Sequence, residues 1–125
     1  METAPFGALA YLKLGRDEEA YELAKIAVSP EQKTEKTTTF NMCYSTLGIV
    51  AAKRGSLDEA NGYFTQAMDY AKRSKMPMYE VLTARDWKKH LLEPNGRDTG
   101  AAEVAIDEAC SKMSKTREDL ARILN

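Results

Sequence analysis

The sequence has few of the residues on which most catalytic and metal sites depend. It contains two cysteines, Cys43 and Cys110, far apart in the chain, together with one histidine and one tryptophan. The cysteines fit no metal or redox spacing, so we expect two buried thiols. His90 has no phosphate loop, paired histidine or nucleophile turn near it. We therefore predict no enzymatic activity, no metal and no cofactor.

Long apolar runs and an excess of one charge are also missing. The longest uncharged apolar stretch, 47–52, is far shorter than the roughly 20 residues of a membrane span. The 18 basic and 19 acidic residues are interleaved and give a net charge of -1, which disfavours nucleic-acid binding. The acidic start, Met1-Glu2, does not resemble a secretory signal. We expect an intracellular, cytoplasmic protein without a membrane partner.

A repeat organises most of the chain. Residues 11–20 recur as 51–60, so that Gly15 and Gly55 lie 40 residues apart and each is followed five residues later by alanine. A third glycine, Gly96, follows after 41 residues, and we place the extra residue in the turn Pro94–Thr99. After each glycine, small or bulky apolar residues continue at spacings of four and three: Ala20, Ala24 and Ala27; Ala60, Phe64 and Ala67; Ala102, Ile106 and Ala109. This spacing predicts one buried face on each of three helices.

The second copy resembles the tetratricopeptide repeat, whose signature it follows at Tyr44, Leu47, Gly48, Ala51, Ala60, Phe64 and Ala67. The first copy is partial, with Ala8, Tyr11, Ala20 and Ala27, and the third keeps mainly its second helix. The resemblance implies an all-α fold, in which antiparallel helical hairpins stack as a short right-handed solenoid. It implies one domain, 1–125, with repeats at about 1–35, 36–75 and 76–113 and a capping helix at 116–125. An unrelated antiparallel helical bundle is the alternative.

The expected helices pair as hairpins. In the first hairpin, a helix over Ala4–Leu14 pairs with one over Asp17–Val28. In the second, a helix that ends near Arg54 pairs with Leu57–Arg73, and in the third, Pro77–Leu92 pairs with Thr99–Met113. The helix before Arg54 starts either near Ser29 or in the threonine run 37–39. Capping boxes are predicted at Ser56–Glu59 and Thr116–Asp119. Trp87 is assigned to the interior, with an interface anchor as its alternative.

The two ends of the chain differ in the residues that could cover them. The helix after Thr116 carries Leu120, Ile123 and Leu124 and would close the C-terminal end. We expect the first helix to expose Phe6 and Leu9, because this sequence has no preceding repeat to cover them. We therefore expect either that the chain is a fragment of a longer array or that another surface covers this end.

The tetratricopeptide resemblance also implies where a partner would bind. In that family the first helix of each hairpin lines a concave groove that holds a peptide or a helix. The corresponding positions are Leu9, Lys13, Met42, Ser45, Ile49, Lys53, Asp86, Lys89 and His90. Lys13 and Lys53 are equivalent by the repeat, so an acidic peptide or a free carboxylate would suit them. The plain alternative is that these lysines are merely solvated. Pro5, Leu9 and Thr46 stand where the family's chaperone-binding members have lysine and asparagine, which argues against that activity.

The predicted function is therefore a scaffold for protein–protein interaction, binding a protein or peptide in the groove. The alternatives are self-association through the uncovered N-terminal face, in a homo-oligomer or against neighbouring repeats of a longer parent chain, and, ranked lower, RNA binding. Catalysis ranks last.

Overall fold

The computed structural model describes residues 11–28 and 37–124, with side chains for 11–28 and 40–123. Residues 11–13 are helical, and the helices that follow are α2 (Asp17–Ala27), α3 (Thr37–Lys53), α4 (Leu57–Arg73), α5 (Pro77–Trp87), the π-helix η1 (Lys88–Leu92), α6 (Gly100–Lys112) and α7 (Arg117–Leu124). Within the described ranges there is no strand. The expected all-α class is confirmed. The helix bounds predicted from 57 onward agree with those observed to within a residue or two, and the predicted helix at Ala4–Leu14 lies mostly outside the described residues.

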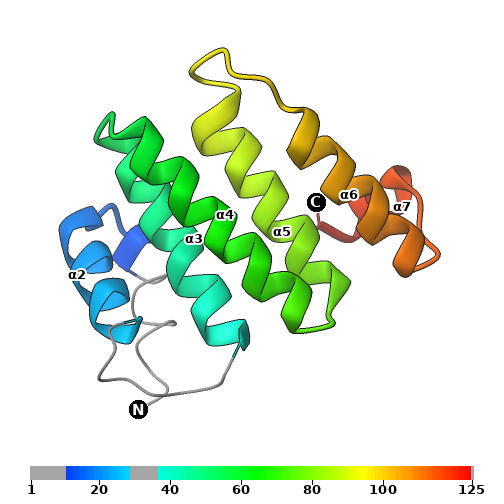
Figure 1. Ribbon diagram of the computed structural model, residues 1–125, viewed down its shortest axis with the longest axis horizontal. Helices are drawn as coiled ribbons and strands as arrows, with labels where there is room; N and C mark the ends of the chain where they lie inside the picture. The colour runs from blue at the N-terminus through cyan, green and yellow to red at the C-terminus, as the bar shows by residue number, and fades with distance from the viewer. Residues whose placement is uncertain (1–10, 29–36, 125) are drawn as a thin grey trace.

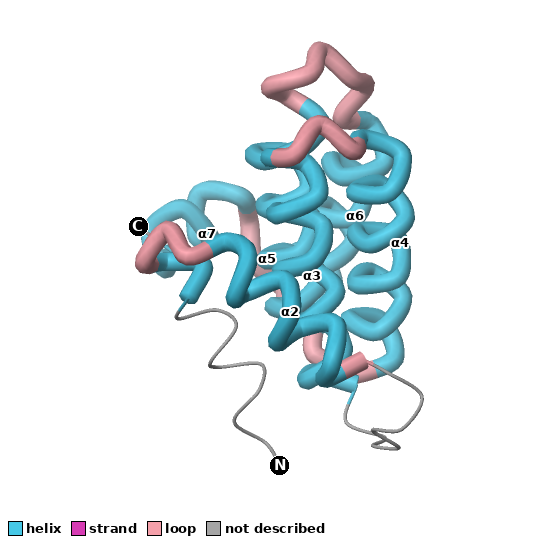
Figure 2. Tube along the Cα trace, turned by 90° about the vertical axis from the view of Figure 1, so that its left-hand side faces the viewer, coloured by secondary structure: helices cyan, strands magenta, loops and turns pink. Residues whose placement is uncertain are grey.

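The helices form antiparallel neighbours that pack side by side (Figure 1). α3 pairs with α4 and α5 pairs with α6, while α2 packs against α3 and α4 packs against α5. Seen from the side, α3 and α5 lie in one layer and α4 and α6 in the other (Figure 2). α3 also contacts η1, so it lies beside both parts of the helix that α5 and η1 form.

Three glycines end helices in the same way. Gly15, Gly55 and Gly96 have φ values of 76°, 80° and 63°, a backbone region that glycine adopts without steric cost. Their amides donate to the carbonyls of Leu12, Ala52 and Glu93, at 3.1, 3.1 and 3.2 Å. The next residue in each case donates to the carbonyl five residues earlier, at 2.8, 3.0 and 2.9 Å. The three turns thus share the two hydrogen bonds of a glycine-ended helix.

The extra residue before Gly96 has a different place from the one predicted. Because the turn at Gly96 matches the other two, its own hydrogen bonds contain no insertion. Immediately before it, the Glu93 amide donates to the Lys88 carbonyl at 2.9 Å, a π-helical bond. A π-helical turn holds one residue more than an α-helical turn. We infer that η1 accommodates the residue added before Gly96. The turn is also longer than the other two, as predicted, because α6 begins four residues after Gly96, whereas α2 and α4 begin two residues after their glycines.

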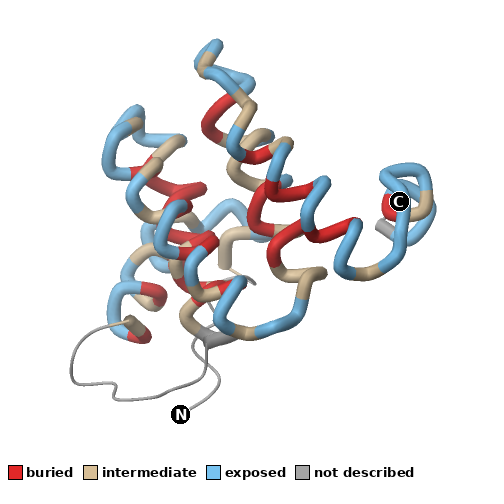
Figure 3. Tube along the Cα trace, turned by 45° about the vertical axis from the view of Figure 1, so that its right-hand side comes forward, coloured by how far each residue is buried: buried red, intermediate tan, exposed pale blue. Residues whose placement is uncertain are grey.

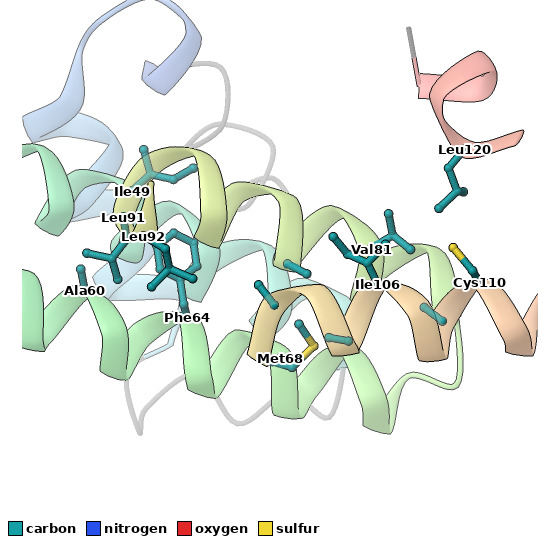
Figure 4. Packing of buried hydrophobic residues seen from close by; sticks show 14 of the residues in the cluster. Ile49, Ala60, Phe64, Met68, Val81, Leu91, Leu92, Ile106, Cys110 and Leu120 are labelled. Atoms are coloured by element: carbon teal, nitrogen blue, oxygen red, sulfur yellow. The ribbon is translucent and has the colours of Figure 1, made fainter. Parts of the chain in front are cut away.

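The predicted buried faces are confirmed. All nine residues at the four-and-three spacing are 7% exposed or less, and Figure 3 shows the buried positions gathered where helices face one another. Phe64 is fully buried and lies beside Leu91 and Leu92 in the close view of the core (Figure 4). A Cβ atom added to Gly48 would come within 2.8 Å of the Phe64 ring. The glycine therefore allows α3 and α4 to approach closely around this aromatic side chain.

Polar groups in the interior are paired. Asn41 Nδ2 donates to the carbonyl oxygen of Ala67 at 2.8 Å and to Thr83 Oγ1 at 2.7 Å, which joins α3, α4 and α5. Glu80, only 2% exposed, accepts hydrogen bonds from Lys112 Nζ at both carboxylate oxygens, each at 3.2 Å. This pair joins α5 to α6. Both interactions fix neighbouring helices in register, because each buried group needs its partner.

The two predicted capping boxes have opposite outcomes. At Thr116 the box is confirmed: the Thr116 amide donates to Asp119 Oδ2 at 2.9 Å, and the Asp119 amide donates to Thr116 Oγ1 at 3.1 Å. At Ser56 the prediction is wrong, since no side-chain hydrogen bond caps α4. Glu59 instead accepts hydrogen bonds from the hydroxyls of Tyr21 and Tyr63, both at 3.1 Å.

The C-terminal helix covers its neighbours only in part. Leu120 is 4% exposed and reaches toward Cys110 (Figure 4), whereas Ile123 is 55% exposed. Of Leu120 and Ile123, therefore, Leu120 is the one that packs α7 against the rest of the chain.

The remaining predictions about the core are met. Cys43 and Cys110 are free and buried, and burial raises the pKa of the Cys43 thiol to about 11. Trp87 packs partly buried against the core, and its Nε1 donates to Asn61 Oδ1 at 3.1 Å. This tryptophan joins α4 to α5, which supports its assignment to the interior.

Candidate binding face

The outer face of α5 and η1 is a candidate for binding a partner. Leu82, Asp86 and His90 recur at spacings of four on the side of the helix opposite the buried Ala84. Side chains that point away from a core are usually well exposed on a convex surface, yet all three are half-buried. Neighbouring groups therefore cover part of each of these side chains.

His90 lies in a basic environment. Its pKa is lowered from 6.5, first by burial and then by the charges of Lys89 and Lys53. Lys53 comes from α3 and Lys89 from η1, so two helices place positive charge near the same imidazole. Three potential donors to an anion thus gather on this face.

Asp86 lies one helical turn before His90. Burial raises the pKa of its carboxyl, and the charges of Arg85 and Lys89 act in the opposite direction. No described residue forms a hydrogen bond or an ion pair with Asp86. Its charge is consequently shielded from water without being neutralised by a direct partner.

We name the set Met42, Lys53, Leu82, Asp86, Lys89 and His90 the α3–α5 face. Among the predicted groove residues, Met42 is half-buried, while Lys53 and Lys89 are exposed. Lys53 Nζ lies 3.5 Å from Asp17 Oδ1, which offsets part of its charge. The structure therefore brings four of the predicted residues, Lys53, Asp86, Lys89 and His90, close enough to interact electrostatically. Met42 lies on the same side of α3 as Lys53, eleven residues earlier.

The other predicted groove residues do not contribute to this exposed surface. Ser45 and Ile49 are only 9% and 6% exposed, which corrects the expectation that they line an open groove. They are buried because α3 is flanked by neighbours on both sides. Lys13 is exposed and has no ion pair within the described part of the chain. Leu9 lies outside the described residues.

A tyrosine cluster joins α2 to the following hairpin. The rings of Tyr44 and Tyr70 stack with centroids 5.7 Å apart and planes at 6°. Tyr21 and Tyr63 share Glu59, and hydrogen bonding to Tyr63 is the first cause that raises the pKa of Tyr21 to about 12. Phe64 is buried, while Tyr63 and Tyr70 are half-buried against neighbouring helices. Tyr63, Phe64 and Tyr70 therefore serve to pack helices against one another.

A hollow lies between Tyr11 and α2. It has a volume of about 260 Å³ and is lined by Tyr11, Glu18, Glu19, Glu22, Leu23 and Ile26. Its walls combine apolar side chains with three carboxylates. Sequence periodicity did not indicate it, because these residues come from the end of one helix and the exposed side of the next.

The described residues form no group of three or more His, Cys, Asp or Glu side chains that could hold a metal ion. None of the helices in the same residues has the length and apolar composition needed to cross a bilayer. The sequence matches no protein-family model, and comparison with curated proteins and with solved structures finds no match either.

Proposed function

We propose that the chain is a tetratricopeptide-like scaffold, with about three stacked hairpins and a capping helix, that binds an acidic peptide segment on the α3–α5 face. The equivalent turns at Gly15, Gly55 and Gly96 support the repeat. The buried positions at a common spacing support it as well.

The gathering of Lys53, Lys89 and His90 carries the proposal. Both lysines act electrostatically on a half-buried imidazole, and Lys89 has no ion pair in the described structure. Carboxylates form charge-assisted hydrogen bonds with such donors. A peptide with acidic side chains or a free C-terminal carboxylate fits this chemistry.

A charge-reversal experiment tests the function. We expect a labelled pentaglutamate peptide to bind the chain at low salt in fluorescence anisotropy, and pentalysine to bind more weakly. The variant Lys53→Glu/Lys89→Glu should weaken pentaglutamate binding roughly tenfold or more, since two attractive charges become repulsive.

The matched control is Lys72→Glu/Lys115→Glu, which makes the same change of charge at exposed lysines outside the α3–α5 face. Circular dichroism should show the same helix content in all variants. Equal weakening by both double variants would mean that net charge alone explains binding, and the proposed site would be rejected.

Self-association is a second candidate, favoured by the hollow on α2. Leu23 and Tyr11 line this hollow and are only partly buried, so a second copy could cover them. In that case Leu23→Glu reduces the mass measured by light scattering. An unchanged mass at high protein concentration would exclude this surface.

A further inference from the structure

We infer that the α3–α5 face recognises a paired motif in its peptide: a lysine or arginine that contacts Asp86, one helical turn from an acidic residue that contacts Lys89 and His90. This inference rests on the proposed function and adds a requirement for positive charge in the ligand.

Asp86 differs from every other carboxylate that is similarly removed from solvent. Among the described residues, the buried or half-buried acids are Asp17, Glu80, Asp86, Glu103 and Asp119. Four of them have cationic partners. Asp17 pairs with Lys53, Glu80 with Lys112, Glu103 with both Lys88 and Arg117, and Asp119 with Arg122. Asp86 alone in this set has none.

The comparison with Glu80 is the closest, because both acids lie on α5. Glu80 faces α6, and Lys112 from that helix reaches both of its oxygens at 3.2 Å. Asp86 lies roughly 120° around the helix from Glu80, and the neighbouring Arg85 and Lys89 are exposed and form no ion pair with it. A partly desolvated carboxylate gains most from a cation supplied by another molecule.

The spacing on the helix defines the motif. Asp86 and His90 are four residues apart, so their backbone positions differ by about 6 Å along the axis. A helical peptide places side chains at positions i and i+4 at a similar separation. Leu82, half-buried one turn before Asp86, offers an apolar contact to the stem of the ligand's basic side chain.

Three labelled peptides of one helical sequence would test the inference. The first carries lysine and glutamate four residues apart, the second replaces that lysine with glutamine, and the third replaces the glutamate with glutamine. By fluorescence anisotropy at low salt we expect the first peptide to bind roughly tenfold more tightly than the second. The third peptide should bind most weakly, because Lys53 and Lys89 disfavour it.

The variant Asp86→Asn keeps the side-chain shape and should abolish the difference between the first and second peptides. Glu108→Gln removes an exposed carboxylate of α6 and should leave that difference unchanged. Circular dichroism and thermal unfolding confirm that each variant is folded, and Asp86→Ala serves as a second removal of the charge.

The outcomes separate the two proposals. If the first two peptides bind the unmodified chain equally and Lys53→Glu/Lys89→Glu weakens both, the acidic site stands and the role of Asp86 is rejected. If no peptide responds to Lys53→Glu/Lys89→Glu, the acidic site itself is rejected together with this inference. A lysine preference that persists in both Asp86 variants would also overturn it.

Discussion

The hairpin of α3 and α4 and the hairpin of α5, η1 and α6 use the same helical arrangement in different ways. The first follows the repeat signature closely and contains the fully buried Phe64 against Gly48. The second interrupts its first helix with a π-helical turn, and it carries both the ion pair of the buried Glu80 with Lys112 and Asp86, which has no ion pair among the described residues. The first hairpin is thus distinguished by tight apolar packing, and the second by carboxylates that are buried or half-buried.

The difference between the hairpins agrees with our proposal that the outer face of α5 and η1 binds a partner. A residue added to a helix rotates everything that follows it, so η1 changes which side chains lie on the outer face. π-helical turns inside α-helices are frequent at functional sites. The departure from the repeat therefore coincides with the face to which we assign binding.

The largest expected effect is the loss of the Phe64 ring. Phe64→Ala should lower the free energy of unfolding by about 3–5 kcal/mol, because the cavity lies in a fully buried site. The equivalent position of the other hairpin, Ile106, is 7% exposed, and Ile106→Val should lower it by only about 0.5–1.5 kcal/mol. Urea denaturation measures both. Similar losses for the two variants would remove the contrast between the hairpins.

Breaking the ion pair of the second hairpin comes next. Lys112→Met should lower the free energy of unfolding by about 1–3 kcal/mol, since it leaves the buried Glu80 without its donor. The double variant Glu80→Met/Lys112→Met removes both charges and should recover much of that stability. If the double variant unfolds as readily as the single one, the lost stability comes from packing rather than from an unpaired carboxylate.

The two helical glycines of the first hairpin should respond in opposite directions. Gly48→Ala places a methyl group against the Phe64 ring and should lower the free energy of unfolding by about 1–3 kcal/mol. At Gly62 nothing lies within 4 Å of an added Cβ, so Gly62→Ala should raise it by about 0.5–1 kcal/mol. Thermal unfolding distinguishes the two, and a stabilising Gly48→Ala would contradict the close approach of α3 and α4.

Thr116, which precedes α7, and Ser56, which precedes α4, form another matched pair. Thr116→Ala removes an observed cap of α7 and should lower the free energy of unfolding by about 1 kcal/mol. Ser56→Ala should change it little, because Ser56 does not cap α4. Chemical denaturation monitored by circular dichroism provides both values. A comparable loss at Ser56 would mean that its hydroxyl contributes in another way.

The smallest expected effect is the pH dependence of binding. The pKa of His90 is lowered in the free chain, and a bound carboxylate would raise it. Acidification from about pH 7.5 to about pH 5.5 should therefore strengthen pentaglutamate binding by a few fold through protonation of His90. Asp86, whose pKa is raised by burial, would add to the effect if it also gained a proton.

His90→Gln should remove the part of this pH dependence that belongs to the imidazole, and comparison with Asp86→Asn separates the two groups. An identical pH profile in His90→Gln and the unmodified chain would exclude the imidazole from the site. In the absence of ligand the sign is reversed: the lowered pKa makes the folded chain less stable as pH falls through the unfolded-state pKa near 6.5.

Much of the fold could be predicted from local sequence patterns. The four-and-three spacing placed nine residues in the core, Pro77 was expected at a helix start, and Gly15, Gly55 and Gly96 at helix ends, as observed. Less of the candidate site could be predicted. The prediction that Ser45 and Ile49 are exposed was wrong, because their exposure depends on how closely other helices flank α3. The prediction of a capping box at Ser56 was also wrong, because Glu59 accepts hydrogen bonds from two tyrosines instead.

The sequence by itself determined the helices, their buried faces and the shared glycine turns, because hydrophobic periodicity and glycine conformation act over a few neighbouring residues. Only the tertiary structure decided that η1 takes up an added residue, that Lys112 reaches Glu80, and that Asp86 stays without an ion pair among the described residues. These features depend on which distant side chains approach one another. That approach is set by the packing of helices rather than by the order of residues within any one of them.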